Sequence, residues 1–400
     1  MLSRRSFLQQ SSLVSLSPIL PCIFGSTAKA AALAPDEKVL VVVQLDGGND
    51  GINTVVPFDD DGYGRTRDKL RLETKKLHKL SDAVGLHPNM QAAKELFDDG
   101  RLTIVQGVGY PNPNRSHFTS MKIWQTAEQD EALHDGYGWL GRTLDLQSAQ
   151  AHSSTSPTAI FVGEQETPVA LWGRRSTATA LSRTDDLKLL SEFAAEQGKF
   201  ELASREHGLQ QFVTKQVLQA YAASDEFQQQ ELTTTSVSYP DTQLASRLKL
   251  VSTLLKSNSH TRVFYTVQDG YDTHSAQLYT HARLLGEFSA AVKAFLDDLK
   301  AAGLEDRVIL LAFSEFGRRA QENDSQGTDH GTAGPVFLAG SSVIPGLVGE
   351  LSDLSDLANG DIKMQIDFRS VYATFLDDWL RIDSKKVLGD TFKRLPLIKV

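Results

Sequence analysis

Short, strongly apolar runs alternate along this chain with longer amphipathic stretches. The apolar runs are rich in β-branched and aromatic residues and are mostly bounded by glycine, aspartate or asparagine, as buried strands of a mainly parallel sheet should be. The predicted strands are Val39–Leu45, Leu102–Gly107, Ala159–Val162, Arg262–Val267, Val308–Phe313 and Val336–Ala339. This pattern predicts an α/β fold, with a doubly wound, mainly parallel sheet and helices on both faces.

The clearest helix is predicted between the fourth and fifth of these strands. Apolar residues recur there at three- and four-residue spacing over Ser275–Ala302, and Gly303 follows as a C-cap. A strand, a helix and a second strand in this order make the crossover that a parallel sheet requires. Two further amphipathic helices are predicted at Thr242–Leu255 and Asp367–Leu380.

One segment differs from the strand-and-helix alternation. Asp185–Leu232 is polar, rich in glutamine and helical in propensity, and it contains no predicted strand. We interpret it as part of a helical insertion at about 185–257, placed beside the sheet within a single domain of residues 36–400.

The first thirty residues have the features of an export signal. Paired arginines and then Phe and Leu stand in Ser3–Leu8, a mildly apolar stretch runs to Phe24, and Ala28–Ala30 offers small residues for cleavage. Residues 1–30 are therefore predicted to be a twin-arginine signal, read by the twin-arginine export machinery. The mature protein would be periplasmic or secreted. The alternative is a basic N-terminus ahead of a short apolar helix.

Net charge and cysteine content exclude some classes of partner and predict a mature chain without disulfides. The net charge of −9 becomes −12 once the signal, with three basic residues and no acidic ones, is removed. This balance argues against nucleic acid and against an anionic membrane surface as partners. The only cysteine, Cys22, lies in the signal, so the mature chain would have no disulfide. No later apolar run reaches the roughly 18 residues that a membrane span needs.

Side chains that commonly bind metal ions follow several predicted strands. These residues are Asp46, Asp272, His274, Glu315, Asp329 and His330. Open α/β sheets gather ligands at the carboxyl ends of their strands, so we expect these residues to share one site. Alternate residues of an extended segment point to the same side, which suits Asp272 and His274 as two ligands of one cation.

Each of these signals also has a simpler explanation. The glycine-rich loop after Asp46 can be a turn with no ligand. Asp272 can form a turn with His274 at the start of the next helix, and Asp329 and His330 can be joined by a loop hydrogen bond only. Four strand ends that each carry such residues are harder to explain by turns alone.

A cation, a hydroxyl and an imidazole stand side by side after the second predicted strand, at Arg115, Ser116 and His117. A serine becomes a nucleophile only when a base or a metal ion activates it. No G-x-S-x-G motif surrounds Ser116, which argues against an ordinary serine hydrolase. The alternative is that Ser116 caps a helix that begins near His117.

Six motifs resemble a family of bacterial exported proteins known as domain of unknown function 1501, and the resemblance covers nearly all of the mature chain. They are LDGGNDGINTVVP at Leu45–Pro57, NRSHFTSMKIWQT at Asn114–Thr126, GYDTH at Gly270–His274, FSEFGR at Phe313–Arg318, GTDHG at Gly327–Gly331 and DFRSVYATFLDDWL at Asp367–Leu380. That family is similar in turn to the alkaline phosphatase and sulfatase superfamily.

The superfamily resemblance implies a role for each strand end. Asp46 would bind one metal ion and Ser116 would be the nucleophile. Asp272 and His274 would bind a second ion, and Glu315 would replace the aspartate of an Asp-His pair. The late histidine of the phosphomutase branch would correspond to His330, while Arg115 would hold the anionic group and His117 would be a base or a ligand.

This sequence departs from the superfamily's motifs at two points that affect which metal ion the site would prefer. The usual Asp-x-x-x-His spacing is Asp-x-His here, and Phe316 stands where the pair has its histidine. A site with fewer nitrogens favours Mg²⁺, Mn²⁺ or Ca²⁺ over Zn²⁺, with one or two ions bound. The resemblance thus implies metal-dependent hydrolysis of a phosphate or sulfate ester.

Whether the protein is an enzyme stays open at this stage. The alternative is a non-catalytic exported protein that keeps a degenerate or structural metal site and binds a glycan or a partner protein. A glycoside hydrolase that uses Glu315 and Asp46 ranks below both, because it gives the histidines no role.

Overall fold

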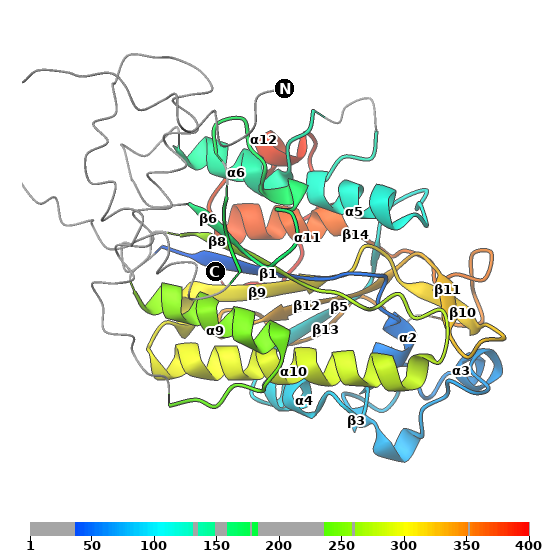
Figure 1. The fold of residues 1–400 in the computed structure, drawn as a ribbon. Coiled ribbons are helices and arrows are strands. Elements are labelled where there is room, and N and C mark those ends of the chain that lie inside the picture. Colours follow the sequence, from blue (N-terminus) through cyan, green and yellow to red (C-terminus); the bar gives the residue numbers. More distant parts are fainter. Residues whose placement is uncertain are drawn as a thin grey trace, which may run out of the picture. The chain divides into compact units, whose positions relative to one another are not determined.

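A nine-stranded sheet forms the centre of the computed structural model (Figure 1). The structure describes residues 37–130, 135–148, 158–176, 178–182, 236–257, 261–350 and 353–399. The strand order is β13-β5-β12-β9-β1-β8-β6-β7, and β14 also pairs with β5. The strands are β1 (Val39–Leu45), β5 (Leu102–Gly109), β6 (Ala159–Val162), β7 (Thr179–Leu181), β8 (Val263–Gln268), β9 (Val308–Phe313), β12 (Gly334–Ala339), β13 (Gly346–Val348) and β14 (Ile366–Asp367).

Strand direction confirms the predicted fold class. Every pair in the sheet is parallel except those of β12, which runs antiparallel to both β5 and β9. The strand predicted at Val336–Ala339 is therefore present, but it runs against its neighbours, because an apolar run does not encode direction. The sequence missed β7, β13 and β14, which are too short to show a periodic pattern.

Helices cover both faces of this sheet (Figure 1). On one face lie α4 (Gln91–Asp98), α9 (Gln243–Lys256) and α10 (Gln277–Ala301); on the other lie α5 (His117–Thr126), α6 (Trp139–Ser148), α11 (Phe368–Thr374) and α12 (Ser384–Leu388). Alternate residues of β1 enter the two cores: Val41 packs with the first set of helices, and Leu40 and Val42 with the second. Burial on both sides explains why β1 is apolar throughout.

The predicted helices are largely confirmed, with one change of type. The helix expected at Ser275–Ala302 is α10, and Gly303 follows it at φ +69°. At Asp367–Leu380 the chain forms α11 and then a π-helical turn, η5 (Phe375–Trp379), in which the Leu380 N–H donates to the Phe375 carbonyl at 2.8 Å. The helix predicted there is therefore present, but its second part is a π turn, which apolar spacing does not distinguish from an α turn.

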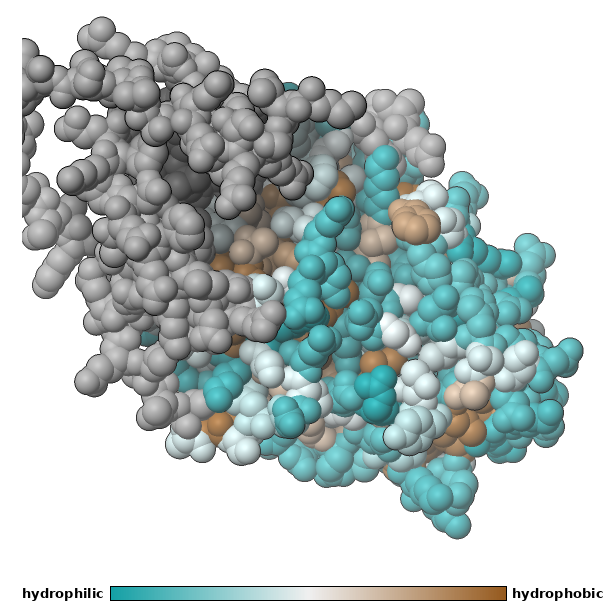
Figure 2. Space-filling view, in the orientation of Figure 1, coloured by the Kyte–Doolittle hydropathy of each residue, from teal (hydrophilic) through white to brown (hydrophobic). Residues whose placement is uncertain are grey.

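Short elements gather near α2, which follows the carboxyl end of β1 (Figure 1). They are α2 (Gly51–Thr54), α3 (Asp61–Thr66), the sheet of β2 (Val55–Val56), β4 (Gly85–Leu86) and β3 (His78–Lys79), and the hairpin of β10 (Arg318–Glu322) and β11 (Thr328–His330). Single 3₁₀ turns occur at η1 (Thr74–Lys76), η3 (Val169–Leu171) and η4 (Glu305–Arg307). The right-hand part of the face in Figure 2, where Figure 1 places α3 and the hairpin, is mostly hydrophilic.

A buried ion pair anchors the loop after β1. The Asp50 carboxylate accepts from the N–H groups of Ile52 and Asn53 at the start of α2, as a cap residue should. It also binds the guanidinium of Arg67 at 2.6 Å, and both side chains are fully buried. Asp50 is thus the cap residue of α2, and its ion pair adds a tertiary constraint that the sequence did not reveal.

Two predictions fall outside the described residues: the signal at residues 1–30 and the polar part of the insertion, Asp185–Leu232. The helix expected at Thr242–Leu255 corresponds to α9. Within the described part of the chain, no helix is both long and apolar enough to cross a bilayer.

Candidate metal centre

Two strand ends meet where β1 and β8 finish. Gly47 has φ +114°, and a Cβ added to it would lie 2.5 Å from the backbone nitrogen of Asp272. The Tyr271 N–H donates to the Asp46 carbonyl at 3.1 Å. Only glycine permits this backbone conformation and this approach, which brings the loop after β1 against the loop after β8.

His117 begins α5 and is held by a buried carboxylate. Its Nδ1 lies 2.7 Å from Oε1 of Glu315, a side chain that is fully buried. The Gly47 N–H donates to both oxygens of that carboxylate, at 3.0 and 3.3 Å, and the Ser314 hydroxyl lies 3.0 Å from Oε2. The bond to Glu315 raises the pKa of His117.

Two further histidines are oriented in the same way. In β11, Nδ1 of His330 lies 2.7 Å from the backbone carbonyl oxygen of Arg115. After β8, Nδ1 of His274 lies 3.3 Å from Oδ1 of Asp329. Carbonyl and carboxylate oxygens accept hydrogen bonds, so we assign the proton of each neutral ring to Nδ1. Each Nε2 then carries a lone pair.

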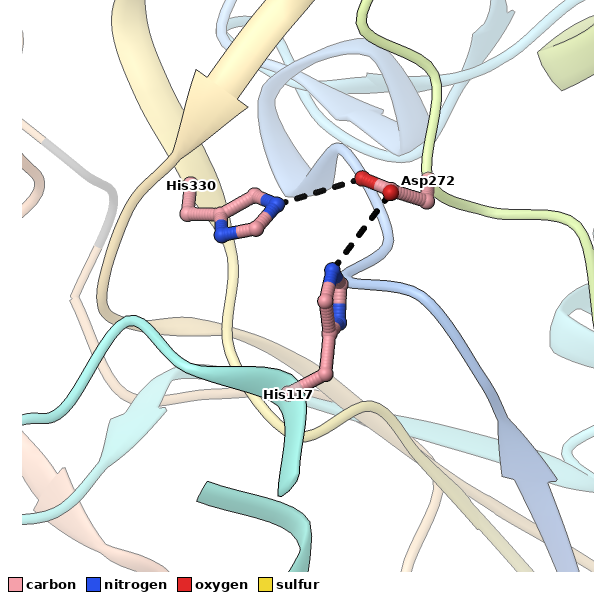
Figure 3. Close-up of side chains that lie close together, drawn as sticks. All are labelled: His117, Asp272 and His330. Atoms are coloured by element: carbon pink, nitrogen blue, oxygen red, sulfur yellow. Dashed lines mark hydrogen bonds and ion pairs between the residues drawn. The ribbon is translucent and has the colours of Figure 1, made fainter. Parts of the chain in front are cut away.

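These lone pairs converge on one carboxylate. His117 and His330 point toward Asp272 from different segments of the chain (Figure 3). Nε2 of His330 lies 3.2 Å and Nε2 of His274 lies 3.1 Å from Oδ1 of Asp272, while Nε2 of His117 lies 3.5 Å from Oδ2. Ligand atoms of His117, Asp272 and His330 all lie within 4.8 Å of one another.

The arrangement fits a bound cation. Nε2 of His117 is buried and has no hydrogen-bond partner among the described residues. Nε2 of His274 lies 2.9 Å from Nε2 of His330. Histidines that bind metal ions usually donate their other ring N–H to a carboxylate or a backbone carbonyl, as all three rings do here. We name His117, Asp272, His274 and His330 the His/Asp cluster.

The sequence prediction for this site differs from the structure in two ways. Among the predicted ligands, Glu315 and Asp329 each bind Nδ1 of a histidine, while His117, expected to be a base or a ligand, joins the cluster. The converging group thus contains two imidazoles and one carboxylate, with the imidazole of His274 beside it, where an oxygen-rich set was expected. Sequence spacing could not reveal this, because it does not show which ring nitrogen faces the site.

Asp46 lies beside the cluster but outside its ligand group. The Gln44 amide donates to Oδ1 of Asp46 at 2.9 Å, and the Tyr265 hydroxyl fixes the amide by donating to its oxygen at 2.6 Å. Burial, and then the charge of Glu315, raise the pKa of Asp46. The carboxylate thus sits next to the His117–Glu315 pair and is held in place from β1 and β8.

Ser116 was expected to be a nucleophile or a helix cap, and Arg115 to hold an anionic group; the structure shows what each side chain contacts. Ser116 is the N-cap residue of α5 by position, but its hydroxyl caps no N–H, is exposed, and has no hydrogen-bond partner among the described residues. The guanidinium of Arg115 forms an ion pair with the buried carboxylate of Asp361. Its backbone carbonyl, and not its charge, reaches the His/Asp cluster.

Arg318 is the residue that sequence reasoning missed. Its buried guanidinium donates to the carbonyls of Gly48 at 2.6 Å, Thr328 at 2.8 Å and Tyr271 at 3.0 Å, and also to the carbonyl of Gly47. Nη2 also donates to Oδ1 of Asp272 at 2.8 Å. Partial burial would raise the pKa of Asp272, but the hydrogen bond from Arg318 lowers it. The sequence feature that could have pointed to Arg318 was its place as the last residue of the FSEFGR motif.

Comparison with known structures shows only distant similarity. The C-terminal periplasmic domain of EcEptC from Escherichia coli, in complex with Zn, is 9% identical (76% of this chain, 74% of that chain, TM-score 0.36). A protein in the alkaline phosphatase superfamily from Vibrio parahaemolyticus is 11% identical (81% and 65%, TM-score 0.38). The PsFucS1 sulfatase from Pseudoalteromonas sp. is 10% identical (88% and 68%, TM-score 0.38). Similarity at this level carries no argument about what this chain binds or does.

Comparison at the level of sequence is more specific. A search among curated proteins finds no match to this sequence. A family model described as "Protein of unknown function (DUF1501)" matches residues 37–392, a range that includes every motif quoted above and every member of the His/Asp cluster. The predicted family is thereby confirmed: this chain belongs to the DUF1501 family.

Proposed function

We propose that this chain is an exported, metal-dependent hydrolase of phosphate or sulfate esters. The observation that carries the proposal is the convergence of the imidazoles of His117 and His330 with the Asp272 carboxylate. Nε2 of His274 lies 3.1 Å from the same carboxylate, and every Nδ1 is bonded to an oxygen acceptor. His117, His330 and His274 would hold the ion together with Asp272. Three nitrogens favour Zn²⁺ or another transition ion over Ca²⁺ or Mg²⁺.

The bound ion would polarise the ester oxygen and lower the pKa of an adjacent hydroxyl or water. The chain's own residues would place the substrate. The first N–H groups of α5, a helix of ten residues, have no acceptor within the helix and point to the side where Ser116 lies. Such a terminus stabilises an anionic group. Ser116 is the proposed nucleophile because its hydroxyl is exposed and makes no cap hydrogen bond.

The charges in contact with the cluster balance once a divalent ion is bound. Asp272 contributes one negative charge, and the adjacent guanidinium of Arg318 offsets it at 2.8 Å. With neutral imidazoles, Glu315 beside His117 and Asp329 beside His274 contribute two further negative charges, which a divalent ion would offset. The ion itself, and not an excess of positive charge, would then hold a phosphate or sulfate group.

One observation favours the alternative of a non-catalytic binding protein. Among the described residues, no side chain hydrogen-bonds to the Ser116 hydroxyl, so no base of this chain is in position to deprotonate it. In that case the ion would itself be the binding element, or would be structural.

The test compares hydrolysis by signal-less protein loaded with Zn²⁺ or Mn²⁺, with p-nitrophenyl phosphate and p-nitrocatechol sulfate as probes. We expect measurable turnover that falls at least about a thousandfold in Ser116→Ala and in His117→Ala. Ser355→Ala, which removes another exposed serine, is the control and should keep full activity. Undiminished turnover in Ser116→Ala would reject the nucleophile. Absence of turnover with either ester, in protein that retains its ion, would favour the binding protein.

A further inference from the structure

Arg318 is a buried cation whose guanidinium is surrounded by oxygen atoms. Its guanidinium is fully buried and contacts oxygens from the loop after β1, the loop after β8 and strand β11. One of those oxygens, Oδ1 of Asp272, belongs to the His/Asp cluster. A guanidinium stays charged in proteins, so a fixed positive charge lies within hydrogen-bond distance of a proposed metal ligand.

This arrangement resembles the environment of a metal ion without containing one. Four backbone carbonyls and one carboxylate oxygen surround the guanidinium, which is a set of hard oxygen donors. A second ion bound through the same oxygen of Asp272 would have to displace Nη2 of Arg318. That displacement would leave a buried cation without its carboxylate, which is strongly unfavourable.

The remaining acidic side chains near the cluster are already engaged. The oxygens of Glu315 accept from the Gly47 N–H and from Nδ1 of His117, and Oδ1 of Asp46 accepts from Gln44. Oδ1 of Asp329 accepts from Nδ1 of His274 and from the Asn323 amide. Phe316, whose ring centroid lies 5.0 Å from that of His117, offers no ligand atom. Across the described residues, the His/Asp cluster contains the only group of three metal-binding side chains that converge.

We propose that the centre binds one divalent ion per chain, and that Arg318 supplies the charge that a second ion would otherwise bring. This inference rests on the metal centre of the proposed function. It also gives Arg318 a positioning role, because its bond to Oδ1 fixes the Asp272 carboxylate toward the histidines. The ion then shares Asp272 with a guanidinium instead of with another metal.

Stoichiometry tests this inference directly. Signal-less protein is stripped with a chelator, titrated with Co²⁺ and followed by the visible absorption of the ion. Zinc-loaded protein is counted separately by plasma mass spectrometry. We expect a single break at one Co²⁺ per chain, one zinc per chain, and loss of both in His330→Ala. Paramagnetic resonance of the Co²⁺ protein should show an isolated ion.

The outcomes separate this inference from the proposed function. A break at two ions, or a spin-coupled pair, would overturn the single-ion inference and leave the metal centre standing. Failure to bind any ion would overturn the metal centre itself, and this inference with it. Arg318→Lys keeps a charge but loses the planar set of donors, so we expect one ion bound about tenfold more weakly. Unchanged affinity in that variant would refute the positioning role.

Discussion

The Nε2 atoms of His274 and His330 lie 2.9 Å apart, although the partners of both rings leave each of these nitrogens with a lone pair. Two lone pairs that face each other repel unless a proton or a metal ion lies between them. Both nitrogens also face the carboxylate of Asp272. This contact, together with the convergence of His117 and His330 on Asp272, is what makes the site a candidate metal centre.

The orientation of His117 by Glu315 should matter for metal affinity. Glu315→Gln keeps the size of the side chain but allows its amide to donate to Nδ1, which moves the ring proton to the nitrogen that faces the ion. We expect Zn²⁺ affinity to fall about 10- to 100-fold, measured by competition with a chromophoric chelator. Asp329→Asn is the matched comparison, and its effect should be smaller, because Asp329 is exposed and its bond to His274 is 3.3 Å long. Equal effects of the two variants would contradict this ranking.

The close approach of Gly47 to the backbone of Asp272 should be as important for metal binding as any ligand side chain. Gly47→Ala would place a Cβ 2.5 Å from the Asp272 nitrogen at φ +114°, so the loops after β1 and β8 must separate. We expect a loss of about 1–3 kcal/mol in the free energy of unfolding, together with weaker metal binding. Gly303→Ala tests backbone strain alone, since its φ is +69° and no atom lies within 4 Å of the added Cβ. It should cost about 1–2 kcal/mol and leave metal binding unchanged. Weakened metal binding in Gly303→Ala would show that a loss of stability alone, without separation of the two loops, weakens metal binding.

The buried pair of Asp50 and Arg67 should contribute strongly to stability. Asp50→Ala leaves the guanidinium buried without its carboxylate, and we expect urea unfolding to show a loss of about 3–5 kcal/mol. The double variant Asp50→Ala, Arg67→Met should recover part of that loss, because no uncompensated charge remains. Glu73→Ala breaks an exposed pair with Lys76 and should leave the unfolding midpoint unchanged. A double variant no more stable than Asp50→Ala would argue against this explanation.

Two buried histidines predict acid sensitivity. Burial, and then the charge of His281, lower the pKa of His87 to about 3, and burial lowers the pKa of His281 to about 4. Between these values and about 6.5, the unfolded chain binds more protons than the folded one, so stability rises with pH in that window and is lost as pH falls through it.

Each of these histidines adds up to roughly 1.4 kcal/mol per pH unit to that slope. His281→Gln keeps a donor for the oxygen of Asn49, which His281 contacts at 2.9 Å, but cannot titrate. Urea unfolding between pH 7 and pH 5 should therefore show a shallower dependence in His281→Gln than in the unsubstituted protein. Identical slopes would mean that the burial of His281 does not set the acid response.

Much of the fold could be predicted because burial on both faces imposes a local pattern. β1 and β9 are apolar along their whole length, and α10 repeats its apolar residues every three or four positions. The short edge strands, such as β13, carry no such pattern, because their pairing depends on neighbours far away in sequence. The antiparallel direction of β12 was hidden for the same reason.

The sequence by itself determined the α/β class, the central strands and the fact that acidic and imidazole side chains follow them, since these depend on residue type and spacing. Only the tertiary structure decided what those side chains do. It turned Glu315 from an expected ligand into the partner of His117, brought His117 to Asp272, and buried Arg318 beneath the same carboxylate. The reason is physical: a residue's chemistry is local, but the direction of a ring nitrogen or a guanidinium is set by packing between loops that lie far apart in the chain.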